Sequence, residues 1–189
     1  YLRAMGADVS GAGTDMIRIK GVTKLSGYVE HEVIPDRIVA GTYMTAAAIT
    51  GGNIVIKNVI HEHVASIVHV LRDCGCDIRI GKNEICVNGP ARPKAVDTIR
   101  TLPYPGFPTD MQAQMVALLS ITKGTSIVVE TVFENRYKHV EELLRMGADI
   151  KLAGRVAVIN GVKGLTGANV TSWDLRGGAA LVLAGLAAE

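Results

Sequence analysis

The sequence LRMGADI at residues 144–150 has two close relatives in the same chain, LRDCGCDI at 71–78 and LRAMGADV at 2–9. The glycines of these three strings, Gly6, Gly75 and Gly147, are 69 and 72 residues apart. A recurrence at such a constant distance is the signature of a repeated structural unit. The chain is therefore predicted to consist of copies of one unit of about 70 residues.

Each complete copy of the unit has the same predicted order of elements. An Ala-rich helix comes first, followed by a strand, an amphipathic helix that ends at the repeated glycine, and a β-hairpin. In the two copies these elements are predicted at 41–50 and 111–122, 54–59 and 126–132, 64–74 and 137–146, and 77–87 and 150–159. The fold class is therefore α+β, and units this small must pack on one another to bury their apolar faces.

The outer copies of the unit are incomplete. Residues 1–22 supply only a closing hairpin, and a third copy begins at Trp173 but reaches only its first helix by Glu189. Because a unit without its partners leaves apolar faces uncovered, we expect the chain to be a segment cut at both ends. Residues 23–31, between the first two copies, are the expected boundary between two lobes.

The composition excludes several classes of protein. Of the 189 residues, 48% are hydrophobic and 4% aromatic, the net charge is +2, and no basic run interleaved with aromatics indicates a nucleic-acid partner. No apolar stretch approaches the roughly 20 residues that span a bilayer, so no membrane partner is expected. The three cysteines, Cys74, Cys76 and Cys86, lack a CxxC spacing and predict reduced thiols in a cytoplasmic protein.

Acidic residues stand at the start of three predicted helices, at Asp36, Asp110 and Asp174. The string YPGFP at 104–108 forbids regular structure ahead of Asp110, and Thr109 is expected to cap the helix that follows. Capping alone explains most acidic residues in a first helical turn. Here the same placement occurs three times, twice with an arginine close behind, so we expect a functional role as well.

The repeat and the helix starts together resemble the enolpyruvyl transferases. The strings that carry the resemblance are IPDRI at 34–38, YPGFPTDMQAQ at 104–114, ENRY at 134–137, RMGAD at 145–149 and DLRGGAAL at 174–181. They are spread over nearly the whole chain. The strings at 104–114 and 134–137 are most similar to the branch of the family that acts on a nucleotide sugar.

The resemblance implies two similar lobes, each an α/β prism, or inside-out barrel, of three units with helices inside and sheets outside. Residues 1–33 are then the end of the first lobe, and residues 34–189 form the second, catalytic lobe, truncated in its third repeat. The missing first lobe of the same chain is an expected partner, and the segment alone is expected to be inactive.

The resemblance further implies the activity. The enolpyruvyl group of phosphoenolpyruvate is moved to the 3'-hydroxyl of UDP-N-acetylglucosamine and phosphate is released, as the first committed step of peptidoglycan synthesis. Neither a cofactor nor a metal is implied, and the spacing of His61, His63 and His69 does not predict a metal-ligand set.

Family roles carry over to four matching residues. Asp110 is expected to take the proton of the attacking hydroxyl as general base. Arg136 and Arg176 are expected to bind the carboxylate of phosphoenolpyruvate with planar, permanently charged forks. Asp174 is expected to orient the arginines and to assist proton transfer at the tetrahedral adduct, with simple helix capping as the alternative.

Four more residues are expected at the substrates. Thr109 precedes Asp110, the backbone of Val132 is expected at the nucleotide sugar, and Asp36 and Arg37 are expected at the junction of the lobes. From the residues alone, Val132 is the last residue of a β-run, and Asp36 and Arg37 are a cap and a solvated charge.

Two other functions stay open. The shikimate-pathway enolpyruvyl transferase has the same fold and donor but a small anionic acceptor. A repeat-built RNA-binding module without catalysis would need basic, aromatic sheet faces, which the hairpins at 77–87 and 150–159 do not supply.

Overall fold

The computed structural model describes residues 1–189, which divide into two compact units, residues 1–34 and 35–189. Unit 1 holds the hairpin of β1 (Asp8–Ser10) and β2 (Arg18–Lys20), in which Val9 lies opposite Ile19. The hairpin expected near the start of the chain is thus present. Whether the two units belong to two lobes stays a prediction.

Unit 2 contains two complete copies of the repeat and the start of a third. The first copy consists of α1 (Arg37–Thr50), β3 (Asn53–Lys57), η1 (His61–Val64), α2 (Ala65–Asp73), β4 (Asp77–Ile80) and β5 (Glu84–Asn88). The second consists of η2 (Thr109–Met111), α3 (Gln112–Leu119), β7 (Thr125–Val129), α4 (Lys138–Arg145), β8 (Asp149–Ala153) and β9 (Val156–Asn160). The third copy supplies α5 (Leu175–Leu186).

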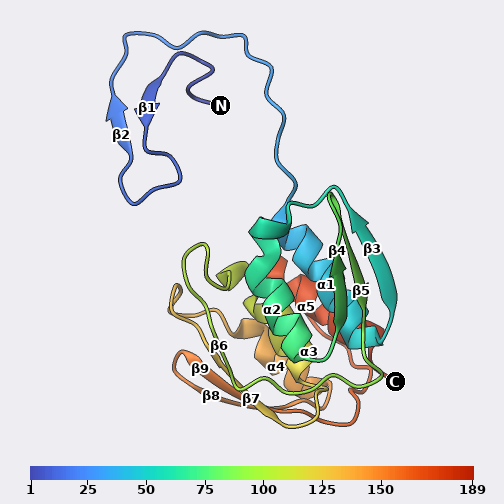
Figure 1. Cartoon of the computed structure of the whole chain (residues 1–189). Helices are drawn as coiled ribbons and strands as arrows, with labels where there is room; N and C mark the ends of the chain where they lie inside the picture. Colours follow the sequence, from blue (N-terminus) through green and yellow to red (C-terminus); the bar gives the residue numbers. More distant parts are fainter. The chain divides into compact units, whose positions relative to one another are not determined.

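The strands of unit 2 form two sheets, with strand orders β3-β5-β4 and β6-β7-β9-β8. In both sheets the hairpin pairs antiparallel with the first strand of its copy, Ile54 opposite Val87 and Ser126 opposite Ile159. Figure 1 shows the helices of unit 2 gathered on the inside and the two sheets on the outside. The α+β prediction is confirmed, with the helices inside as the prism requires.

One strand was not predicted. β6 (Thr98–Arg100) pairs in parallel with β7, with Ile99 opposite Val128. The parallel pairing brings the segment that follows β6 and the segment that follows β7 to the same edge of the sheet. This edge carries the candidate site.

The helix α3 forms the centre of the core. All of its residues are buried, and Met115, Val116 and Leu118 are fully buried. A helix that is buried on every face must be surrounded by other elements, and α3 packs against α1 and α5. Gly41 allows a close approach in α1, since a Cβ atom there would lie 2.8 Å from Cδ1 of Ile67.

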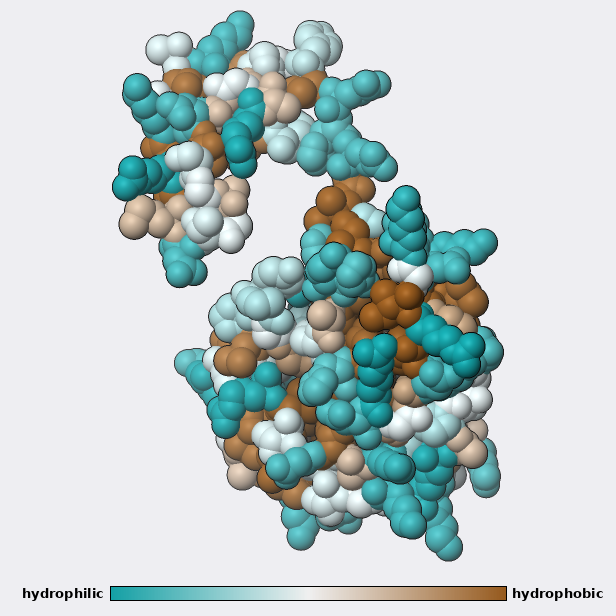
Figure 2. All heavy atoms as spheres, in the orientation of Figure 1, coloured by the Kyte–Doolittle hydropathy of each residue, from teal (hydrophilic) through white to brown (hydrophobic).

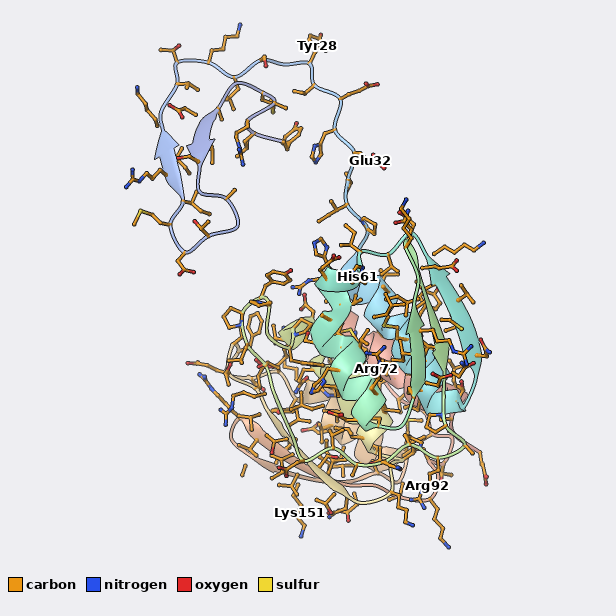
Figure 3. The ribbon with its side chains drawn as sticks, viewed as in Figure 1. Tyr28, Glu32, His61, Arg72, Arg92 and Lys151 are labelled. Carbon is orange, nitrogen blue, oxygen red and sulfur yellow. The ribbon has the colours of Figure 1, made fainter.

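Two arginines donate to backbone carbonyl oxygens of segments that follow helices or strands. Arg92 donates to the carbonyl oxygens of Thr122 (3.2 Å) and Val162 (3.1 Å), and Arg72 donates to that of Ile78 (2.8 Å); both arginines are labelled in Figure 3. The carbonyls at the end of a helix have no partner within the helix. Arg92 therefore connects the turn after α3 with the loop that follows β9.

The outer surface of unit 2 is mixed. Figure 2 shows hydrophilic side chains interrupting hydrophobic ones over the visible face. None of the helices combines the length and the apolar character needed to cross a bilayer.

Candidate active site

Two segments that leave the same sheet edge build the candidate site. The segment after β6 is held in place because Thr101 N donates to Val129 O (3.0 Å) and Leu102 N donates to Phe107 O (2.9 Å). It leads to Asp110 in η2. The segment after β7 leads through Arg136 into α4. The parallel pairing of two strands thereby brings together the carboxylate of Asp110 and the guanidinium of Arg136, which are distant in the sequence.

Asp110 lies between two arginines. Its Oδ1 is 2.5 Å from Nη2 of Arg136, and its Oδ2 is 3.6 Å from Nη2 of Arg176, which comes from α5. The side chains are 39%, 19% and 24% exposed, respectively, so the cluster is partly shielded from water. The structure thus brings together three residues that the sequence had singled out, and it holds both guanidinium groups at the edge of solvent.

Thr109 does not cap the helix, so this prediction was wrong. The residue ahead of η2 is Pro108, and no side chain caps this end. The hydroxyl of Thr109 instead donates to Oε2 of Glu130 (2.8 Å) and accepts from Nη1 of Arg136 (2.8 Å). The charged guanidinium of Arg136 is a stronger donor than a backbone amide, and it occupies the acceptor side of the hydroxyl that a cap would use.

The other two acidic helix starts are caps. Oδ1 of Asp36 accepts from the amides of Ile38 (2.7 Å) and Val39 (3.2 Å), and Oδ1 of Asp174 accepts from the amide of Gly177 (2.7 Å). Asp174 also lines the groove beside Asp110, and its Oδ2 accepts no hydrogen bond from the chain. Asp36 does not line this groove. The three aspartates therefore do not share one role.

Arg37 and Val132 also lie outside the groove. The guanidinium of Arg37 stands over the ring of Tyr104, 5.6 Å from its centroid. Val132 is not the end of a strand, because β7 ends at Val129; its amide donates to Oε1 of Glu130 (2.8 Å). The predicted strand was too long because the chain turns here to satisfy a buried carboxylate.

The groove beside Asp110 has a volume of about 430 Å³. Its lining combines three cationic side chains, two acidic ones, two aromatic rings, an amide and an aliphatic side chain: Arg136, Lys138, Arg176, Asp110, Asp174, Phe133, Trp173, Asn135 and Leu175. The guanidinium of Arg136 also stacks on Phe133, 4.6 Å from the ring centroid. The excess of cationic groups suits an anionic ligand.

Glu130 is the part of the site that the sequence analysis missed. Its side chain is buried, with the residue only 1% exposed, and it accepts four hydrogen bonds. The signal was present in the sequence, because an acidic residue directly after the apolar run at 127–129 needs buried donors.

A buried histidine lies behind the groove. His139 in α4 is 2% exposed, and its Nε2 has no hydrogen-bond partner in the chain. Burial lowers the pKa of His139 to about 4; Asp174 acts in the opposite direction, and Arg136 lowers the pKa further. His139 is therefore neutral at pH 7 and adds no charge to the site.

A family model described as EPSP synthase (3-phosphoshikimate 1-carboxyvinyltransferase) matches residues 1–189. UDP-N-acetylglucosamine 1-carboxyvinyltransferase 1 of Caldanaerobacter subterraneus subsp. tengcongensis is 61% identical over the whole chain, and its namesake in Carboxydothermus hydrogenoformans is 57% identical. The chain spans 45% and 44% of the length of these relatives.

Solved structures agree on the fold. The enolpyruvyl transferase NikO from Streptomyces tendae matches with a TM-score of 0.79 and 23% identity, covering 98% of this chain and 45% of its own. EPSP synthase from Acinetobacter baumannii matches with a TM-score of 0.70 and 22% identity, covering 99% of this chain and 47% of its own.

Proposed function

The chain belongs to the EPSP synthase family of enolpyruvyl transferases, and on this premise we propose that it carries the catalytic residues of a UDP-N-acetylglucosamine 1-carboxyvinyltransferase. In the proposed reaction the 3'-hydroxyl oxygen of the sugar bonds to C2 of phosphoenolpyruvate, while the hydroxyl loses its proton and the C3 methylene gains one. The tetrahedral adduct then expels phosphate as its new methyl group loses a proton.

The observation that carries the proposal is the cluster in which one carboxylate, Asp110, lies between two arginines at the edge of a groove. We assign Asp110 as the general base for the sugar hydroxyl. A general base must lie within hydrogen-bond reach of the proton that it takes, and the partial exposure of Asp110 leaves its oxygens accessible from the groove.

We assign Arg136 and Arg176 to the anionic groups of phosphoenolpyruvate. Their forks match a carboxylate or a phosphate in two parallel hydrogen bonds, and their charge does not depend on pH. We assign Asp174 to proton transfer at the adduct. One of its oxygens is engaged in the cap of α5, which fixes the side chain, and the other is open.

Thr109 acts in this proposal as a link that holds Arg136. Asp36, Arg37 and Val132 lie outside the groove, and we keep them as proposed contacts for the nucleotide sugar rather than for the donor. The lining of the groove therefore does not support a substrate contact by any of these three residues.

The acceptor distinguishes the proposal from its alternatives. Relatives at 56–61% identity over the whole chain are named for UDP-N-acetylglucosamine, whereas the EPSP synthase structure is only 22% identical and supports the fold alone. The match of a transferase family to the whole chain favours catalysis over a binding module. We therefore propose a cytoplasmic role in peptidoglycan synthesis, which three free thiols support.

A chimera tests the proposed function. The 189 residues replace the matched segment of the Caldanaerobacter relative, and phosphate release from phosphoenolpyruvate is measured with UDP-N-acetylglucosamine or with shikimate 3-phosphate. We expect release with the nucleotide sugar only, and none from the 189 residues alone. A folded chimera that releases no phosphate, or that prefers shikimate 3-phosphate, would contradict the proposal.

A further inference from the structure

The carboxylate of Glu130 joins both segments of the site. Its Oε1 accepts from the hydroxyl of Thr101 (2.9 Å) and from the amides of Val132 (2.8 Å) and Phe133 (3.1 Å). Its Oε2 accepts from the hydroxyl of Thr109 (2.8 Å). One buried group thus binds the segment that follows β6, the segment that follows β7, and the residue next to Asp110.

A directed series of hydrogen bonds runs from Glu130 to Asp110. Arg136 donates through Nη1 to Oγ1 of Thr109 at 2.8 Å, and the hydroxyl of Thr109 donates a hydrogen bond to Oε2 of Glu130. Arg136 donates through Nη2 to Oδ1 of Asp110. The buried carboxylate accepts the hydroxyl hydrogen of Thr109, which leaves Oγ1 free to accept from Arg136. A hydroxyl that accepts from a cation also donates more strongly, so the two hydrogen bonds reinforce each other.

The fold of the repeat does not require this carboxylate. β3 and β7 occupy the same place in their copies, starting at Asn53 and Thr125. The residue after β3 is Asn58, which is exposed and adopts a left-handed conformation with φ of 55°. The residue after β7 is Glu130, which is buried with four donors. Only the copy that carries Asp110 and Arg136 has the buried acid.

We infer that Glu130 is a positioning residue, which holds Thr109 and Arg136 so that the guanidinium and Asp110 keep their relative geometry during the reaction. This inference rests on the proposed function for its catalytic consequence, but the positioning itself can be measured without substrate. Both oxygens of the carboxylate accept hydrogen bonds, so its geometry is fixed on both sides.

The variant Glu130→Gln separates positioning from packing. Glutamine has the shape of glutamate and keeps one carbonyl oxygen for Thr101 and the two amides. Its amide nitrogen would face Thr109, whose oxygen already accepts from Arg136. Thr109 then loses its acceptor and meets two donors, so its bond to Arg136 weakens while the loop at 132–133 stays bound.

The first measurement is nuclear magnetic resonance of the 189-residue chain. In Glu130→Gln we expect the side-chain Nε–H signal of Arg136 to shift and the amide signals of Val132 and Phe133 to stay close to those of the parent. The exposed Glu84→Gln is the matched control and should shift none of them. An unshifted Arg136 signal in a folded Glu130→Gln would overturn the inference.

The second measurement is kinetic and uses the chimera. We expect kcat to fall by about 10-fold or more in Glu130→Gln, with KM for the nucleotide sugar changed less than about threefold, because positioning acts in the transition state. The double variant Glu130→Gln/Thr109→Val should have a kcat no lower than that of Thr109→Val alone, because both changes break the same series of hydrogen bonds. The inference would also be overturned if Glu130→Gln kept a kcat within twofold of the parent. The same holds if the loss of kcat in the double variant equalled the product of the two single losses.

The two failures can be told apart. If the parent chimera lacks turnover, the proposed function fails, and the resonance measurement still decides whether Glu130 positions Arg136. If Glu130→Gln does not fold, Thr109→Ser and Thr109→Val carry the test, because both cut the packing little and only the second removes the hydroxyl. Equal Arg136 signals in these two variants would overturn the inference.

Discussion

Oδ2 of Asp110 lies 3.6 Å from Nη2 of Arg176, and the two residues hold equivalent places in successive repeats. Asp110 is the second residue of η2, and Arg176 is the second residue of α5. Ile38 holds the same place in α1 and is buried. The ion pair therefore connects two copies of one unit at the point where both copies present the start of a helix.

Replacing Asp110 by asparagine should remove the proposed base without changing the shape of the site. We expect phosphate release by the chimera to fall by about 10²-fold or more, the usual scale for a positioned acid or base. Asp97→Asn is the control, since Asp97 is exposed and its side chain makes no hydrogen bond in the chain. Near-normal turnover of Asp110→Asn would remove Asp110 from its proposed role.

Two glycines of α5 should respond in opposite directions to alanine. A Cβ atom at Gly177 would lie 3.0 Å from Oδ2 of Asp174 and 3.2 Å from Cβ of His139, whereas at Gly185 it would meet nothing within 4 Å. We expect Gly177→Ala to lower the free energy of unfolding by about 1 kcal/mol or more through overpacking. Gly185→Ala should raise it by up to about 1 kcal/mol through helix propensity.

Urea unfolding of the 189-residue chain measures both changes in the glycine pair. The two variants share one helix and one substitution, so the difference between them isolates the crowding at the start of α5. A stabilising Gly177→Ala would mean that α4 and α5 have room to separate.

Acid should destabilise the fold through His139. Burial lowers the pKa of this histidine from 6.5 to about 4, so between these pH values the unfolded chain binds a proton that the folded chain does not. The contribution is complete above pH 6.5 and is lost as the pH falls toward 4. Between pH 7.5 and pH 5 we expect a loss of about 2 kcal/mol in the free energy of unfolding.

Urea unfolding at the two pH values tests the role of His139. The variant His139→Gln should lack this part of the pH dependence, while His69→Gln, at a side chain that is 80% exposed, should keep it. Identical pH dependence in the parent and in His139→Gln would show that the histidine is not the titrating group.

The three thiols should differ in reactivity. Burial raises the pKa of Cys74 to about 12 and that of Cys76 to about 11, whereas Cys86 is only partly buried. The thiolate is the reactive form. In the native chain at pH 8 we expect a disulfide reagent to modify one thiol quickly, and all three after unfolding. Cys86→Ser should abolish the fast reaction; fast modification of two thiols would contradict the burial of Cys74 or Cys76.

The repeat made most of the fold predictable from sequence. The glycines at 75 and 147 both have positive φ and end the second helix of their copies, and both predicted hairpins are present. The boundaries were less accurate. The helix α1 begins at Arg37 rather than at 41, because Asp36 caps it at the first place where a side chain can satisfy its free amides.

The parts that could not be predicted depend on partners distant in sequence. β6 is a strand because β7 offers it hydrogen bonds, and its three residues carry no signal of their own. Thr109 has the sequence of a cap but binds Glu130, which lies 21 residues further on. The meeting of Asp110 with Arg136 and Arg176 was expected from the family resemblance, since no local spacing encodes it.

The difference between Asn58 and Glu130 shows what duplication of a unit permits. Because the two strand ends are equivalent, one copy of the unit can retain a purely structural residue while the other copy acquires a residue that serves the site. The exposed position of Asn58 could therefore be substituted by a second acidic residue without disturbing Glu130.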